Sequence, residues 1–354
     1  MSKNMKTILM EVCLLALAIG SAMTVDGQTN VGINLIYLVI GFVLLIKGAD
    51  WFVDGASKIA DKLGIPKLVV ALTIVAFGTS APEAAVSITA AMHGDSSIDI
   101  AIGNVLGSNI MNVLVILGIS CIICPLAVQK STRKYEIPFV IFISILLSAF
   151  GMLDGEIGRV DGIIFAGLLV LFIIYLLIMA KKGQGQTEEV EGATEDDRLW
   201  QMLLSIIIGG ACIVIGSNVT VSSASVIAAY CGMSSKLIGL TVVALGTSLP
   251  ELITSSIAAF RKQADIAIGN IVGSNIFNIL FVAGIASIVS PTALPFKNAT
   301  TDFFVDSLVA IAAVVILFLG VLNKKSRLNR LAGVVLLGCY GAYFVYLLMS
   351  NGII

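Results

Sequence analysis

Charged side chains are scarce in this chain. Of its 354 residues only 12% are Asp, Glu, Lys or Arg, while 58% are hydrophobic, and the mean hydropathy is +1.04. This composition excludes an ordinary soluble domain and is typical of a protein that crosses the membrane many times. The formal net charge is −1, and we expect no nucleic-acid partner.

Histidine and paired cysteines are also lacking. The one histidine is His93, and the six cysteines are scattered through apolar segments. Zn²⁺ and Cu⁺ prefer imidazole and thiolate ligands, so a site for either ion is not expected. No disulfide framework is expected, and Cys121-x-x-Cys124, which has no second pair, predicts small core residues. There is no H-E-x-x-H and no G-x-S-x-G, so an intramembrane hydrolase would lack a base for its serine, and we expect no enzyme.

Long apolar windows dominate the rest of the sequence. Ten are about 20 residues long, which is enough for a ~30 Å hydrocarbon core. They cover 33–57, 66–92, 98–124, 136–152, 160–180, 200–230, 234–260, 264–290, 302–322 and 329–350. Ahead of them, residues 1–24 carry Lys3, Lys6 and an apolar run, which indicates either a signal peptide or an extra span. The expected fold class is an all-α polytopic membrane protein.

One hydrophilic segment, residues 181–198, separates residues 33–180 from residues 199–354, with five windows on each side. It is predicted to be a solvated linker, and its acids lack the spacing of an EF-hand calcium loop. Successive spans place the loops alternately on the two sides of the membrane. Counted in this way, fifteen Lys and Arg lie on the same side as the linker and three lie on the opposite side. Because cytoplasmic loops collect Lys and Arg, the linker is predicted to be cytoplasmic.

The two halves repeat a pair of polar motifs. GTSAPEAAVSITAA at residues 78–91 matches GTSLPELITSSIAA at residues 246–259. DIAIGNVLGSNIMN at residues 99–112 matches DIAIGNIVGSNIFN at residues 265–278. Because each half has an odd number of spans, five, the second copy crosses the membrane in the opposite orientation to the first. This pattern predicts an inverted-topology repeat of five-helix units with ten core transmembrane helices, as in secondary transporters.

Each motif places polar groups inside a span. An ionised side chain in the bilayer is costly, so Glu83 and Glu251 are candidate functional residues by default. A proline one position earlier should break each helix and turn nearby carbonyls into the gap. Hydroxyls lie beside each acid, and a Ser and an Asn four residues apart share a face of the next helix. These groups are Pro82 and Pro250, the carbonyls of Ala76 and Ala244, and the side chains of Thr79, Ser80, Thr247, Ser248, Ser108, Asn112, Ser274 and Asn278.

All of these candidate ligands are oxygens, which suits hard cations such as Ca²⁺ and Na⁺. The charge of two ionised Glu is balanced by one Ca²⁺ or by at least two Na⁺. Competition between the two ions for one site can therefore produce exchange. Simple ion pairing does not account for the acids, because Lys47 is the only cation more than three residues from the end of any span, and it has no counterpart in the second half. No cofactor is expected beyond these transported ions.

These doubled motifs, GTSxPE followed by GNxxGSN, resemble those of the cation/calcium exchanger superfamily, and the resemblance extends to GADWFVDGASKIADKLG at residues 48–64. It implies alternating access by a monomer in a prokaryotic inner membrane and exchange of Ca²⁺ for Na⁺, electrogenic at the family's usual three Na⁺ per Ca²⁺. It also implies that the groups named above, from Ala76 to Asn278, are the ligands. Some relatives have Asp at the position of Asn278. The absence of that carboxylate here argues against potassium co-transport and against a proton site at this position. The second half also has Asn218-Val219-Thr220 where the first has Asp50-Trp51-Phe52.

Two other transport functions remain open at this point. A pair of Glu can bind protons, so H⁺/Ca²⁺ exchange is the alternative to Na⁺/Ca²⁺ exchange. A cation channel would use similar ligands, but two inverted copies in one chain suit alternating access better.

Overall fold

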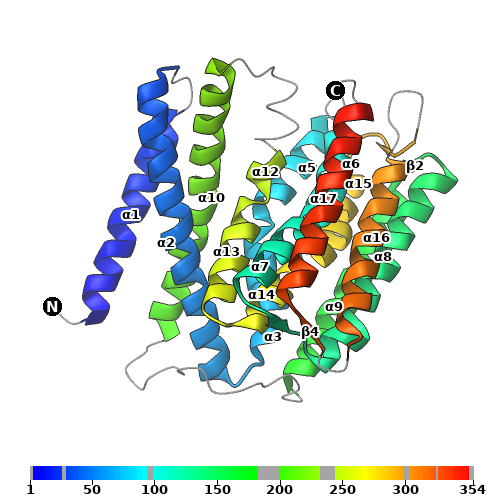
Figure 1. Cartoon of the computed structure of the whole chain (residues 1–354), viewed down its shortest axis with the longest axis horizontal. Coiled ribbons are helices and arrows are strands. Elements are labelled where there is room, and N and C mark those ends of the chain that lie inside the picture. The colour runs from blue at the N-terminus through cyan, green and yellow to red at the C-terminus, as the bar shows by residue number, and fades with distance from the viewer. Residues whose placement is uncertain are drawn as a thin grey trace.

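A computed structural model describes residues 3–25, 29–93, 99–181, 199–231, 244–297, 303–323 and 326–350. These residues are almost entirely helical, and the helices form one bundle (Figure 1). The predicted linker lies outside the described residues except for Lys181, so its solvation stays a prediction.

The first half contains α1 (Lys3–Val25), α2 (Val31–Leu63), α3 (Lys67–Val70), η1 (Ala71–Val75), α4 (Ala76–Thr79), α5 (Ala81–His93), α6 (Asp99–Met111), η2 (Asn112–Ile116), α7 (Leu117–Ile123), β1 (Leu126–Ala127), η3 (Thr132–Glu136), α8 (Ile137–Leu153), β2 (Glu156–Ile157) and α9 (Arg159–Lys181). The second half contains α10 (Leu199–Tyr230), α12 (Ala244–Thr247), α13 (Leu249–Phe260), α14 (Ala264–Phe277), η5 (Asn278–Ala283), α15 (Gly284–Val289), β3 (Leu294–Pro295), α16 (Phe304–Val321), β4 (Arg327–Leu328) and α17 (Arg330–Ser350). The four η segments are π-helical turns inside longer helices.

Eight of the described helices are long and apolar enough to cross a membrane. A ninth span results if the bent pair Lys67–Thr79 and Ala81–Met92 is taken as one. Of the span predicted over 234–260, residues 244–260 are described, as α12 and α13. The expectation of an all-α polytopic membrane protein is confirmed.

Two long helices, α2 and α10, pack against each other at one side of the bundle (Figure 1). Their backbones touch at glycines: a Cβ on Gly48 would lie 2.8 Å from the Gly209 carbonyl oxygen, and one on Gly216 would lie 3.0 Å from the Gly41 carbonyl oxygen. Residue numbers therefore rise along α2 as they fall along α10, so the two helices are antiparallel. An inverted repeat predicts this orientation for the first helices of its two halves.

Helix α1 packs along the α2–α10 pair. Ala18 is fully buried in an apolar cluster with Leu44 and Trp51. The buried Glu11 carboxylate accepts a 2.7 Å hydrogen bond from the Ser205 hydroxyl of α10. The segment predicted to be a signal peptide or an extra span is thus a helix that joins the bundle by apolar packing and one polar contact.

Two small antiparallel sheets, which were not predicted, tie the halves together. Strand β1 pairs with β4, with Leu126 opposite Leu328, and β2 pairs with β3, with Glu156 opposite Pro295. Each sheet joins a loop of the first half to a loop of the second. Figure 1 shows β4 and β2 toward opposite ends of the bundle.

Candidate functional site

Both motif helices are broken at a serine in the middle of the bundle. Helix α4 ends before Ser80 and α12 ends before Ser248, and both serines have nearly the same backbone angles (φ −83° and ψ 8°, φ −93° and ψ 5°). The two pieces of the first broken helix meet at 48°. Pro82 and Pro250 follow in the first turn of the next helix, where the missing N–H is tolerated. Each break therefore falls two residues before its proline, close to the position that the prolines predict.

The two acids lie just beyond these breaks. Glu83 is in the first turn of α5 and Glu251 in the first turn of α13, and both are almost completely buried, with 1% and 0% of their surface exposed. Neither is among the ion pairs of the described residues, which join Asp50 and Asp54 of α2 to basic side chains. Because a buried, unpaired carboxylate is strongly unfavourable, each acid needs a cation or a proton.

Hydroxyls from one half reach the carboxylate of the other. The Ser80 hydroxyl donates to Glu251 Oε1 at 2.9 Å, and the Ser248 hydroxyl donates to Glu83 Oε1 at 3.3 Å. From the sequence, Ser80 was expected beside Thr79 and Glu83 on one helix face. The break at Ser80 instead turns its hydroxyl toward the second half, so the two motif copies form one site.

The next helix of each half contributes a further hydroxyl. The Ser108 hydroxyl on α6 donates to Glu83 Oε1 at 3.4 Å, and the Ser274 hydroxyl on α14 donates to Glu251 Oε1 at 3.5 Å. The Ser248 hydroxyl also lies 3.3 Å from the Ser108 hydroxyl. Each carboxylate therefore faces one hydroxyl from its own half and one from the other half.

Four asparagines form a pair of cross-links between the halves. The Asn112 side-chain amide donates to Asn275 Oδ1 at 2.9 Å, and that of Asn278 donates to Asn109 Oδ1 at 3.1 Å. Asn109 and Asn275, which directly follow Ser108 and Ser274, are thus each bonded to the other half. Asn112 and Asn278 each open a π-helical turn, a feature that occurs often at functional sites.

The two threonines of the motifs are also bonded across the halves. The Thr79 hydroxyl donates to Asn270 Oδ1 at 3.0 Å, and the Thr247 hydroxyl donates to Asn104 Oδ1 at 3.4 Å. These contacts place both threonine hydroxyls beside asparagine oxygens of the other half.

Two further serines hold these asparagines and were missed in the sequence. The Asn104 amide donates to the Ser87 hydroxyl and the Asn270 amide to the Ser255 hydroxyl, both at 2.9 Å. Ser87 and Ser255 are each the tenth residue of their motif copy, so their matching positions were a signal that could have been used.

Four buried oxygens of the site accept no hydrogen bond from any described residue. They are one carboxylate oxygen each of Glu83 and Glu251 and the amide oxygens of Asn112 and Asn278. Leaving such an acceptor unsatisfied costs about 1–3 kcal/mol, and more for a charged group. Since the four occupy matching positions in the two halves, they mark a site built for a ligand that interacts with oxygen.

The Ala76 carbonyl differs from the expectation. It accepts the Ser80 N–H at 3.0 Å and the Thr79 hydroxyl at 3.3 Å, so the helix break does not free it. The prediction of an open carbonyl at Ala76 is therefore wrong, because the helix continues as far as Thr79. Its counterpart Ala244 is the first residue of α12.

A family model described as "Sodium/calcium exchanger protein" matches residues 33–179 and again residues 202–349. Together the two matches cover most of the chain. The chain belongs to the sodium/calcium exchanger family. Both matched stretches contain one copy of each polar motif, and α1 lies ahead of the first.

Relatives of this sodium/calcium exchanger family member match it over most of their length. It is 40% identical over 320 residues to CaxA of Alkalimonas amylolytica, covering 89% of this chain and 98% of that protein. It is 30% identical over 356 residues to the sodium/calcium exchanger MaX1 of Methanosarcina acetivorans, again covering 89% and 98%. A solved structure of the sodium-calcium exchanger NCX_Mj, soaked with Na⁺ and without Ca²⁺, superposes with a TM-score of 0.75 at 33% identity and covers 89% of this chain and 99% of that one.

Proposed function

We propose that this chain is an antiporter that exchanges Ca²⁺ for Na⁺ by alternating access, with Glu83 and Glu251 binding the ion together. The observation that carries the proposal is the set of four unsatisfied buried oxygens, two of them on these acids and two on Asn112 and Asn278. Two carboxylates neutralise one Ca²⁺ or two Na⁺. Either load makes the buried site neutral, so each displaces the other.

The remaining groups supply enough oxygens for a hard cation. Ca²⁺ takes six to eight oxygen ligands, and the hydroxyls already lie around the carboxylates. The proposed side-chain ligands are Glu83, Glu251, Thr79, Ser80, Thr247, Ser248, Ser108, Ser274, Asn112 and Asn278. The Ala76 carbonyl can join them only if one of its two hydrogen bonds opens, and the Ala244 carbonyl is proposed by analogy.

Na⁺ is favoured over H⁺ as the coupling ion. Among the described residues no group of three or more His, Cys, Asp and Glu lies together, so the site contains two titratable groups and otherwise neutral oxygens. Asn278 does not titrate, which removes one carboxylate that could carry a proton. The relatives MaX1 and NCX_Mj are both called sodium/calcium exchangers.

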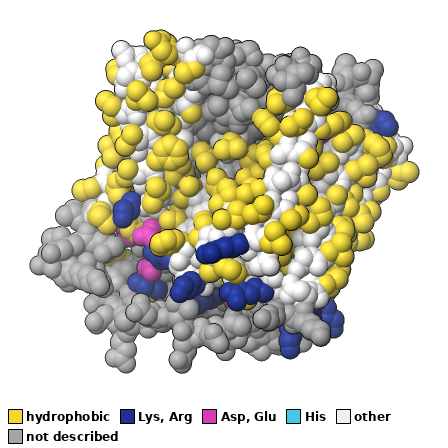
Figure 2. Space-filling model, in the orientation of Figure 1, with side chains coloured by type: hydrophobic (Ala, Val, Ile, Leu, Met, Phe, Trp, Pro, Cys, Tyr) yellow, Lys and Arg dark blue, Asp and Glu magenta, His cyan; other side chains and the backbone are white. Residues whose placement is uncertain are grey.

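The distribution of basic residues supports an orientation in the membrane. Figure 2 shows most Lys and Arg side chains of this face in its lower part. Arg133, Arg327 and Arg330 bond to Ser326 and to carbonyls near the β1–β4 sheet, whereas Arg159 bonds to the Ser290 carbonyl toward the opposite end. We place the β1–β4 end and the linker at residues 181–198 in the cytoplasm of a prokaryotic cell, and the chain in its plasma membrane as a transporting monomer.

Purified protein in liposomes tests the coupling ion. Liposomes loaded with Na⁺ and diluted into Na⁺-free buffer should take up ⁴⁵Ca²⁺, and a protonophore should leave this uptake intact. If exchange moves three Na⁺ per Ca²⁺, a membrane potential will change its rate. Uptake driven by a pH gradient alone, with no response to Na⁺, would establish the H⁺/Ca²⁺ alternative instead.

The substitution Asn278→Asp tests the role of the missing third carboxylate. It should raise Ca²⁺ affinity by about tenfold, since ~1.4 kcal/mol of added attraction gives that factor. It should also make uptake fall as the pH is lowered, because the new acid can bind a proton. The initial rate of Na⁺-driven uptake between pH 6 and pH 9 measures both effects, with Asn112→Asp as the matched variant in the other half. Unchanged affinity and an unchanged pH profile would place Asn278 outside the site.

A further inference from the structure

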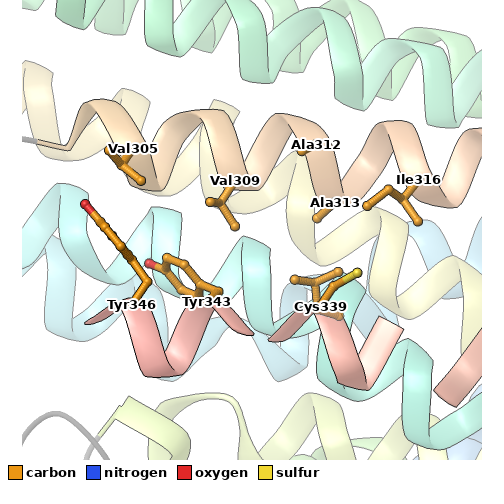
Figure 3. Close-up of a pocket in the computed structure, with 9 residues that line it drawn as sticks. Val305, Val309, Ala312, Ala313, Ile316, Cys339, Tyr343 and Tyr346 are labelled. Atoms are coloured by element: carbon orange, nitrogen blue, oxygen red, sulfur yellow. The ribbon is translucent and has the colours of Figure 1, made fainter. Parts of the chain in front are cut away.

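An apolar groove with a volume of about 230 Å³ lies between α16 and α17, outside the ion site (Figure 3). Buried Leu114 of η2 is one of its lining residues. The other lining residues, which with Leu114 define the α16–α17 groove, are Val305, Val309, Ala312, Ala313, Ile316, Cys339, Tyr343 and Tyr346.

The groove exists because α16 and α17 hardly touch each other. Helix α16 packs mainly on α8, and α17 packs mainly on α7. Small side chains such as Ala312 and Ala313 leave the space between them open. In Figure 3 Val309 and Tyr343 extend toward each other from the two helices without closing it.

The corresponding helices of the first half, α8 and α9, are bridged by aromatic rings. Phe139 stacks on Phe172 with ring centroids 5.6 Å apart, and Phe150 lies 5.6 Å from Phe165. Among the described residues no aromatic pair bridges α16 and α17, since the pairs of Tyr340 are both within α17. The space between α16 and α17 therefore lacks the aromatic side chains that fill the space between α8 and α9.

We propose that the α16–α17 groove binds one acyl chain of a membrane phospholipid. Both helices meet the length and hydropathy of membrane spans, so the groove lies at the depth of the hydrocarbon. From Val305 to Ile316 it follows α16 for about 16 Å, which suits an extended chain of methylene groups. Water is a poor occupant, because apolar cavities stay dry.

Charge at one end of the groove fits the lipid phosphate. Lys297 is exposed, and its ammonium lies 5.3 Å from the centre of the Phe304 ring, next to Val305. Tyr346, which is 42% exposed, lines the same end in Figure 3. Of the acids near this end, Asp306 accepts a 2.5 Å hydrogen bond from the Tyr343 hydroxyl, and Glu156 lies opposite Pro295 in the β2–β3 sheet.

The bound chain would pack directly on the helix that carries the ion site. Leu114, which lines the groove, lies two residues after Asn112 in the same π-helical turn. The acyl chain would thus support η2 from outside. The first half offers a parallel, since Phe165 of α9 packs against Gly284, the residue that directly follows η5.

Photo-crosslinking in liposomes tests the proposal. The probe is phosphatidylglycerol with a diazirine in the middle of one acyl chain, and peptide mapping locates the adducts. Labelling should concentrate on the groove-lining parts of α16 and α17. Val309→Phe, which adds the missing ring, should reduce this labelling by about tenfold, the effect of ~1.4 kcal/mol on binding. Leu308→Phe, on the neighbouring exposed position of α16, is the matched control and should leave labelling unchanged.

Two further variants keep the outcome decisive. Ile316→Phe fills the other end of the groove and should reduce labelling even if Val309→Phe does not fold. Lys297→Gln should reduce labelling severalfold if the phosphate lies there, and equal labelling would remove the headgroup contact from the proposal. Labelling spread evenly over all lipid-facing helices, or adducts between two copies of the chain at this groove, would overturn it. None of these readouts depends on ion transport, so they are independent of the proposed function.

Discussion

Glu83→Gln and Glu251→Gln should each reduce Na⁺-driven Ca²⁺ uptake by at least about 100-fold, which corresponds to ~2.8 kcal/mol. Glutamine keeps the shape of the side chain and one oxygen, but it removes one of the two charges that neutralise Ca²⁺. The remaining complex would carry a net positive charge in a fully buried site, which is strongly unfavourable. Initial rates of ⁴⁵Ca²⁺ uptake into liposomes containing equal amounts of each variant measure the effect.

The control for these substitutions is Glu156→Gln on strand β2. This carboxylate is exposed near one end of the bundle, so its loss should leave uptake within a factor of about two. Both site variants should still purify as monodisperse protein, because no described basic residue pairs with either acid. Wild-type uptake by either Glu variant would remove that residue from the ligand set.

Gly209→Leu is expected to have the second largest effect, through the packing of α2 on α10. A Cβ on Gly209 would lie 2.7 Å from the Gly48 carbonyl oxygen and 2.9 Å from the Phe52 backbone nitrogen. Backbone atoms of a helix cannot move aside as a flexible side chain can, so the two helices must separate. Overpacking of this kind costs about 1–3 kcal/mol or more and should lower the melting temperature by on the order of 5 °C. Uptake should fall as well, because the pair lies beside the site: the Ser217 hydroxyl of α10 donates to the Gly246 carbonyl at 2.6 Å.

The matched control is Gly167→Leu on α9. A Cβ there meets no atom within 4 Å, and the residue faces outward. Its melting temperature should stay within about 1 °C of the wild-type value. If Gly209→Leu were as stable as Gly167→Leu, the close contact between α2 and α10 would not be needed for the fold.

The sequence predicted the features that depend on periodicity and composition. The apolar windows located the spans, and the prolines located the helix breaks to within two residues. The doubled motifs identified Glu83 and Glu251 because an acid at the centre of an apolar window is unusual whatever surrounds it. The doubled motifs also carried the resemblance to the exchanger superfamily, and the family match confirms that resemblance.

The features that depend on contacts between the halves could not be predicted from one half alone. The sequence placed Ser80 beside Glu83, but the break rotates its hydroxyl toward Glu251. The cross-links of Asn109 and Asn275 likewise depend on how the two mirrored units meet. The prediction of an open carbonyl at Ala76 was wrong. A helix can continue to within a few residues of a proline, and here the Ser80 N–H still bonds to that carbonyl.

Equilibrium binding of ⁴⁵Ca²⁺ to the purified chain in Na⁺-free detergent solution tests the central claim most directly. If one ion is held jointly by both halves, the wild type binds one Ca²⁺ that Na⁺ displaces. Glu83→Gln and Glu251→Gln should then each abolish this binding, and the double variant should add nothing to either loss. Two independent sites, with each single variant retaining half of the bound Ca²⁺, would contradict the account.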